Sequence, residues 1–227
     1  MERGTKNSAG FTLVELLIAL ALGLVVLTSV SSAFISQRKT YDAQEQMTEL
    51  IQGTRAVMEI ITREVKLAGF APTGYDSKFE SDPTESQTSP MMQRTDPTAT
   101  RFVGIPYSAT QLELRADLDG DGTASASDSN ELIIYTHDGT NLELDRNAGQ
   151  AWSAARLLAE NIQAFTFTYW KSDGTEVTAT ADEADIRQIK ITITARTAKP
   201  DPGYGLNSGY RTYTLTSTVT PPNLEIQ

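Results

Sequence analysis

The chain has 227 residues, of which 39% are apolar and 21% charged, and its formal net charge at pH 7 is -10. It contains no cysteine, which excludes thiol catalysis, cysteine-zinc sites and disulfides. The acidic balance disfavours nucleic acid as a partner, because a phosphate-binding surface needs clustered cations. The length allows one membrane helix and one soluble domain of ordinary size.

A polar leader, residues 1–10, precedes a long apolar run. The 21 residues from 16 to 36 carry no charge, and as a helix they would be roughly 32 Å long, enough to span a bilayer. A secretory signal peptide has the opposite order, with its cleavage site after the apolar stretch. Arg3 and Lys6 precede the run and favour an N terminus that stays in the cytoplasm.

Glu15 lies at the start of this apolar run. A carboxylate is costly in a bilayer core, so an ionisable residue there is a functional hypothesis by default. The alternative is an acid at the first turn of a helix, which the helix macrodipole favours near the membrane surface.

The residues around the predicted helix start form the sequence Gly10-Phe11-Thr12-Leu13-Val14-Glu15 after a short basic leader. This pattern resembles the prepilin signal of type IV pilins and pseudopilins. The resemblance implies cleavage between Gly10 and Phe11 by a prepilin peptidase and N-methylation of Phe11. It also implies that the Glu15 carboxylate pairs with the N-terminal amine of a neighbouring subunit during filament assembly. Many pilins close their C-terminal region with a disulfide, which this chain lacks.

Residues 11–36 predict the membrane or filament-core half of one long helix, and residues 37–70 its amphipathic half. Apolar or small residues recur at three- and four-residue steps in the second half: Met47, Leu50, Ile51, Thr54, Met58, Ile61 and Val65. This spacing is nearer 3.6 than 3.5 residues, which favours packing on the domain's own sheet over a coiled-coil seam. Gly69 and Pro72 predict the end of the helix.

Residues 71–100 are rich in Pro, Ser, Thr and Asp and predict a polar loop, whereas residues 101–227 predict a β-rich globular domain. Alternating patterns predict strands over residues 112–115, 131–135, 142–144, 165–170, 186–197 and 210–219. Asp138-Gly139-Thr140 predicts a hairpin turn, and residues 155–162 predict a short helix. The fold class expected is therefore α+β, with one long N-terminal helix packed on a mostly antiparallel sheet.

An acidic segment between the first two predicted strands has the spacing of an EF-hand-type calcium loop. Its candidate ligands are Asp117, Asp119, Asp121, Thr123, Ser125 and Asp128, with Gly122 at the sixth position. Four carboxylates without a nearby base repel one another, so binding of a hard cation such as Ca²⁺ would lower their electrostatic repulsion. The alternative is a solvated acidic hairpin loop. A bound Ca²⁺ would serve as a structural staple in a domain without disulfides.

The sequence holds no recognisable enzyme motif: it lacks His-Glu-x-x-His, Gly-x-Ser-x-Gly and a phosphate-binding glycine loop. The single histidine, His137, follows a predicted strand and carries no signal of catalysis. We expect no enzymatic activity.

The layout as a whole resembles the PilW-like minor pilins. This resemblance rests on the prepilin signal, the helix end Leu67-Ala68-Gly69-Phe70, the Asp-rich loop before Glu131-Leu132-Ile133-Ile134-Tyr135, and Leu158-Ala159-Glu160-Asn161-Ile162 before a strand. It implies a subunit that helps initiate a type IV pilus within a tip complex. Its implied partners are other minor and major pilins, the prepilin peptidase, the inner-membrane assembly platform and a large tip adhesin.

The implied location is the inner membrane, crossed once with the N terminus in the cytoplasm and the domain in the periplasm, and then the extracellular pilus. Two alternatives stay open. One is a minor pseudopilin of a type II secretion system (GspJ-like), which is built on the same helix. The other is a calcium-dependent adhesive tip module.

Overall fold

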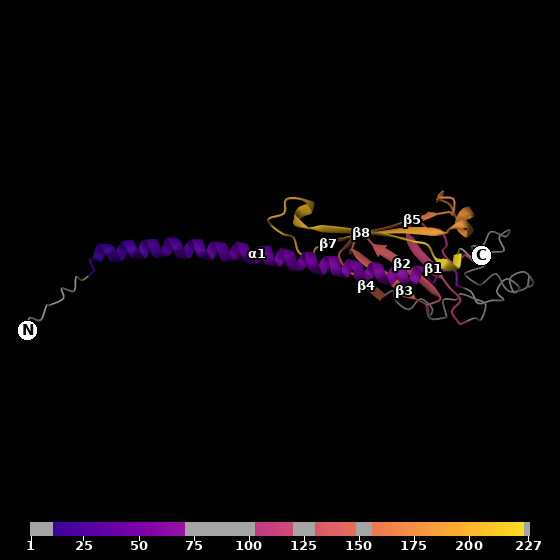
Figure 1. Ribbon diagram of the computed structural model, residues 1–227, viewed down its shortest axis with the longest axis horizontal. Helices are drawn as coiled ribbons and strands as arrows, with labels where there is room; N and C mark the ends of the chain where they lie inside the picture. Colours follow the sequence, from indigo (N-terminus) through magenta and orange to yellow (C-terminus); the bar gives the residue numbers. More distant parts are fainter. Residues whose placement is uncertain (1–10, 71–102, 120–129, 149–155, 225–227) are drawn as a thin grey trace, which may run out of the picture. The chain divides into compact units, whose positions relative to one another are not determined.

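The computed structural model describes residues 11–70, 103–119, 130–148 and 156–224. These residues form one long helix, α1 (Leu13–Val65), eight strands and three short 3-10 helices (Figure 1). The leader and the predicted polar loop lie outside them. The chain divides into two compact units, residues 1–46 and 47–227.

In the first unit the described residues, 11–46, include the apolar half of α1, which ends at residue 36. Its large apolar side chains are exposed, for example Leu20 at 59% and Leu27 at 62%. Within the described ranges, α1 is the one helix long and apolar enough to cross a membrane. An apolar surface of this extent is unstable in water and requires lipid or neighbouring subunits around it.

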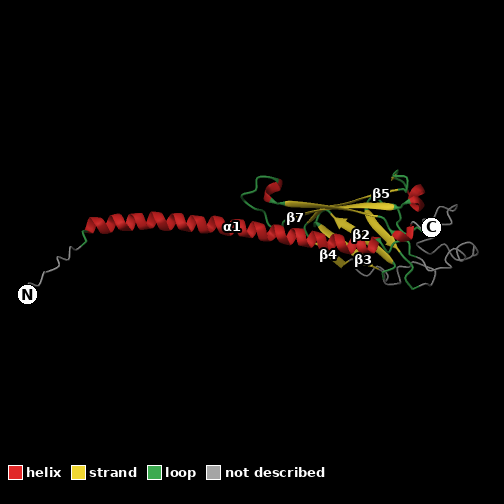
Figure 2. Cartoon of the chain, viewed as in Figure 1, coloured by secondary structure: helices red, strands yellow, loops and turns green. Residues whose placement is uncertain are grey.

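The second unit combines the end of α1 with two antiparallel four-stranded sheets (Figure 2). The first sheet has the order β1 (Gln111–Arg115), β2 (Leu132–Asp138), β3 (Glu143–Ala148) and β4 (Arg156–Ala159). The second has the order β6 (Glu176–Val177), β5 (Ile162–Trp170), β7 (Gln188–Arg196) and β8 (Thr212–Val219). The 3-10 helices are η1 (Thr180–Asp185), η2 (Asn207–Gly209) and η3 (Pro222–Leu224). The expected α+β class is confirmed.

The predicted short helix over residues 155–162 is wrong. Residues 156–159 form β4, which pairs with β3 and places Leu157 opposite Asp145. Asn161 then adopts a positive φ of 60° and turns the chain into β5 at Ile162. Helix propensity is a weak preference, and pairing with a neighbouring strand overrides it here.

The predicted hairpin turn after β2 is confirmed. Asp138 ends β2, and its Oδ1 accepts a hydrogen bond of 2.8 Å from the backbone N–H of Thr140. The backbone N–H groups of Thr140 and Asn141 lower the pKa of the Asp138 carboxyl. β3 begins at Glu143, one residue after the predicted strand start, because Leu142 completes the turn with a φ of 59°.

The apolar stripe of α1 packs on the sheets of its own domain. Val57, Met58, Ile61 and Val65 are buried in one core with residues of both sheets. The alternating residues Ile189, Ile191 and Ile193 of β7 are fully buried in the same core. The stripe therefore serves intramolecular packing, as its 3.6-residue spacing predicts.

The end of α1 requires glycine at two positions. Gly69 has a φ of +80°, and a Cβ there would lie 2.4 Å from Cδ2 of Leu224 in η3. A Cβ on Gly104 would lie 2.3 Å from the backbone nitrogen of Gly69. The N–H of Gly69 donates to the carbonyl of Arg115, at 2.9 Å, so the chain leaving the helix joins the edge of β1. Side chains at either glycine would push these backbones apart.

One buried carboxylate joins the end of α1 to the first sheet. Glu64 accepts hydrogen bonds from Arg146 of β3, of which the shortest is 2.6 Å from Nη2. The hydroxyl of Tyr135 on β2 donates to the other oxygen of Glu64. Burial, followed by the hydrogen bond to Glu64, raises the pKa of Tyr135 above its ordinary value, so the phenol remains a donor. We call these three residues the Glu64 clasp.

Glu64→Ala should lower the free energy of unfolding of this domain by about 2–4 kcal/mol, because it leaves the Arg146 charge and the Tyr135 hydroxyl without their shared acceptor. Urea denaturation of the detergent-solubilised chain, followed by tryptophan fluorescence, measures this. Glu59→Ala, an exposed position on the same helix, is the control and should change stability by less than about 0.5 kcal/mol. Equal effects of the two substitutions would contradict the clasp.

Candidate functional site

The first candidate site is the start of α1. Thr12 precedes the helix and Glu15 lies in its first turn. The Glu15 Oε2 accepts hydrogen bonds from the Thr12 backbone N–H, at 2.9 Å, and from the Thr12 hydroxyl, at 3.0 Å. In return the Glu15 N–H donates to Thr12 Oγ1 at 3.3 Å. This reciprocal arrangement is a capping box, which satisfies N–H groups that a helix start leaves without partners.

The capping box explains why Thr12 and Glu15 occur three residues apart. It also holds the carboxylate of Glu15 next to the chain start that cleavage after Gly10 would create. Phe11, the residue at that predicted start, is 90% exposed. Gly10 lies outside the described residues. The two Thr12 donors to the Glu15 carboxylate are neutral, so they do not compensate its negative charge. A cationic donor would form a stronger hydrogen bond.

The second candidate site is the start of the acidic loop after β1. Asp117, Asp119 and Glu131 each offer one carboxylate oxygen, and these oxygens lie within 4.8 Å of one another. Asp117 and Glu131 are buried, at 0% and 1% exposure. Carboxylate oxygens at this spacing, supplied by residues at both ends of a loop, match the preference of Ca²⁺ for oxygen ligands. Asp121, Thr123, Ser125 and Asp128 lie outside the described residues.

Glu131 is the residue of this cluster that the loop pattern does not predict. It lies three positions beyond Asp128, the predicted last ligand, and immediately before β2. Its Oε1 accepts hydrogen bonds from the backbone N–H groups of Leu118, at 2.8 Å, and Asp119, at 3.1 Å. One signal could have found it: Glu131 shares the alternation of Ile133 and Tyr135, which places it on the buried side of the chain.

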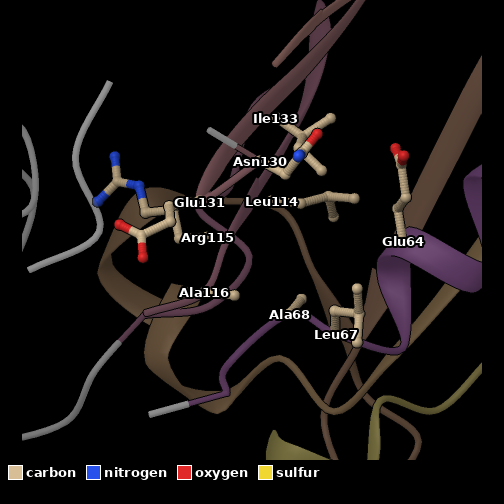
Figure 3. Close-up of a pocket in the computed structure, with 9 residues that line it drawn as sticks. All are labelled: Glu64, Leu67, Ala68, Leu114, Arg115, Ala116, Asn130, Glu131 and Ile133. Carbon is tan, nitrogen blue, oxygen red and sulfur yellow. The ribbon is translucent and has the colours of Figure 1, made fainter. Parts of the chain in front are cut away.

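The acidic loop is also connected to the Glu64 clasp. Asn130, the residue before Glu131, accepts a hydrogen bond of 3.1 Å from Arg146 Nη2. A small pocket lies between Glu64 of the clasp and Glu131 of the acidic loop. Figure 3 shows Glu64 on one side of this pocket and Arg115 and Glu131 on the other. The same guanidinium therefore binds both the helix carboxylate and the residue where the acidic loop returns to the sheet.

The single histidine has a structural contact. His137 Nε2 lies 2.8 Å from the carbonyl oxygen of Ile162, at the start of β5. The contact joins the two sheets at the point where the chain passes from one to the other.

Comparison with known proteins identifies two matching families. The model of "Prepilin peptidase-dependent protein B" matches residues 43–220, which is more than half of the chain. The model of the "Prokaryotic N-terminal methylation motif" matches residues 5–31, which include Gly10, Phe11 and Glu15. No curated protein matches the chain.

Among solved structures, a type IV-like pilin from Thermus thermophilus resembles the chain at 12% sequence identity and a TM-score of 0.39. The alignment covers 77% of this chain and 97% of that pilin.

The long helix with its apolar first half, the antiparallel sheets packed on its second half and the two family matches agree with one another. The chain is a type IV pilin-like protein and belongs to the prepilin peptidase-dependent protein B family.

Proposed function

We propose that this protein is a minor pilin of a type IV pilus, which helps to initiate filament assembly and forms part of a tip complex. The observation that carries the proposal is the combination of a methylation motif over residues 5–31 with a family match over residues 43–220. The exposed apolar half of α1 supports it, since such a surface suits first a membrane and then a helical filament core.

Processing is the first step of the proposed role. Prepilin peptidase cleaves between Gly10 and Phe11, which removes the polar leader and creates a new amine on Phe11. Methylation of that amine keeps its positive charge. The cleaved chain has a cation at its N terminus and a carboxylate at Glu15, within the first turn of the helix.

Assembly then depends on Glu15. In a filament, the Glu15 carboxylate pairs with the Phe11 amine of a neighbouring subunit. Each charge is costly in an apolar surrounding, and pairing them lowers that cost for both. The Thr12 capping box supports this role, because its two neutral donors hold the carboxylate in place until a cationic donor replaces them.

Glu15→Ala should leave cleavage after Gly10 largely intact but reduce incorporation into filaments by about tenfold or more, equivalent to at least about 1.4 kcal/mol of lost pairing energy. Immunoblots of membrane and sheared-pilus fractions separate cleavage from incorporation. Glu45→Ala, which removes an exposed carboxylate further along α1, is the matched control. Normal incorporation of the Glu15→Ala chain would rule out the pairing role.

The partners of the proposed role are other minor and major pilins, the prepilin peptidase and the inner-membrane assembly platform, with a large tip adhesin at the distal end. The protein starts as a single-pass inner-membrane protein whose domain faces the periplasm. It then moves into the extracellular pilus. The runner-up is a minor pseudopilin of a type II secretion system, which uses the same helix and processing.

Deletion of the gene distinguishes the proposed minor-pilin role from the pseudopilin alternative. We expect cells without it to lose surface pili, counted by electron microscopy, while they secrete their exported enzymes normally. Complementation with the intact gene should restore the pili. Normal pili together with lost enzyme secretion would instead assign the protein to the secretion system.

We also propose that the acidic loop binds Ca²⁺ as a structural staple. Asp117, Asp119 and Glu131 support this, because their carboxylates converge from both ends of the loop. The sequence adds Asp121, Thr123, Ser125 and Asp128 as candidate ligands. A staple at this position would hold the end of β1 and the start of β2 together, and through Asn130 and Arg146 it would support the end of α1.

Saturating Ca²⁺ should raise the melting temperature of the purified chain by about 5–10 °C relative to chelator, as expected for a ligand at about 100 times its Kd. Asp117→Ala with Asp121→Ala should abolish this increase. Glu131→Gln should reduce it while its amide oxygen still accepts from Leu118 and Asp119. Glu160→Ala, at an exposed acid elsewhere, is the control. An unchanged calcium response in the first two variants would remove the metal site.

A further inference from the structure

The outward face of the second sheet has an unusual composition. Strand residues alternate between the two faces of a sheet, and the inward set here is the buried core. The outward positions of β5, β7 and β8 include eight threonines: Thr166, Thr168, Thr192, Thr194, Thr212, Thr214, Thr216 and Thr218. All eight side chains are exposed or half-exposed. We call this surface the threonine face.

The threonines stand in register across the strands. Thr192 lies opposite Thr166 on one side and Thr216 on the other, so three hydroxyls form one row. The next row pairs Thr194 with Thr214. The hydroxyls of Thr192 and Thr216 are 3.1 Å apart, and those of Thr194 and Thr214 are 3.0 Å apart. Rows repeat at about 6.8 Å along the strands, which makes a flat array of hydrogen-bonding groups.

Strand propensity explains threonine on a sheet surface, but it does not explain the charges of this face. The chain carries a net charge of -10, yet β5, β7 and β8 place no carboxylate at the outward positions of this face. Their charged residues there are two cations of β7, Lys190 and Arg196. The strand carboxylate of this sheet is Glu176 on the short strand β6, opposite Trp170 and at the end of the face where Lys190 lies.

Lys190 and Arg196 are available for an external anion. Within the described part of the chain, neither makes an ion pair. Lys190 is exposed, and the Arg196 guanidinium stacks over the ring of Tyr210 at 4.2 Å. Stacking fixes the guanidinium and leaves its charge in place. The two cations lie six strand positions apart, which is about 20 Å.

We propose that the threonine face binds an acidic polysaccharide, that is, a chain of sugars with carboxylate groups. The hydroxyl rows would exchange hydrogen bonds with sugar hydroxyls, and Lys190 and Arg196 would bind well-separated carboxylates along the same chain. Trp170, half-exposed at one end of the face, adds an aromatic surface on which a sugar ring can pack.

The charge spacing selects this partner over nucleic acid. A nucleic acid strand carries one phosphate per roughly 3.4 Å, so a 20 Å stretch presents about six charges to two cations. The remaining phosphates would face a strongly acidic protein without compensation. A polysaccharide with sparser charge and many hydroxyls matches both properties of the face. Such binding would give the proposed minor pilin a contact with extracellular material, and only that use of the site rests on the proposed function.

The test measures binding of the full chain, purified in a neutral detergent, to fluorescently labelled alginate, which is a polymer of uronic acids. Labelled dextran is the neutral comparison, and single-stranded DNA is the dense polyanion. Lys190→Glu should weaken alginate binding about tenfold, and Thr192→Val with Thr216→Val about threefold, since valine keeps the shape of threonine but removes the hydroxyl. Arg55→Glu makes the same charge change at an exposed helix position and should change the Kd less than twofold.

The proposal is supported if alginate binds more tightly than dextran and DNA and if the two face variants weaken it while Arg55→Glu does not. It is overturned if alginate fails to bind, if DNA binds as tightly, or if all variants behave alike. Pilus counts in the same variants are scored separately, so failure of the polysaccharide site and failure of the minor-pilin role give different results.

Discussion

The attachment of the second half of α1 to the two sheets is the constraint on which the rest of the domain depends. Ile61 and Val65 are fully buried in the core, and Glu64, one turn from Ile61, binds Arg146 and Tyr135 of the first sheet. The apolar contacts supply most of the attraction, whereas the charged contacts fix the rotation of the helix about its axis. Gly69, Gly104 and Leu224 then close the space at the helix end. A chain without disulfides holds its helix through this packing.

The two halves of α1 are therefore suited to different surroundings. In the second unit the helix needs only one apolar stripe, and exposed charged residues such as Arg55 and Glu59 occupy its other faces. In the first unit the apolar side chains extend around the helix and are exposed, so they require lipid or other subunits. Glu15 is the charged exception among residues 11–36. The capping box with Thr12 satisfies its local hydrogen bonds, and in the proposed filament its charge would be neutralised by the Phe11 amine of a neighbouring subunit.

The acidic loop and the threonine face are two further features of the globular domain. The loop gathers three carboxylates between β1 and β2, and Arg146 connects its return to the helix. The threonine face lies on the opposite side of its sheet from the buried isoleucines of β7. One feature therefore concerns how the domain is held together, and the other concerns what its surface can contact. The same electrostatics governs both: carboxylates repel one another and attract cations, while cations on an acidic protein attract external anions.

The sequence alone determined the long helix, the location of its apolar half, the prepilin signal around Glu15 and most of the strands, because these depend on local spacing and on the alternation of apolar residues. It could not determine which strands pair, and for that reason it predicted a helix where β4 pairs with β3. Tertiary structure alone brought Glu131 to Asp117 and Asp119, joined Glu64 to Arg146 across 82 positions of sequence, and aligned the threonines of β7 and β8. Each of these contacts joins residues from different elements, and their proximity depends on strand register and helix packing, to which local sequence preference contributes little.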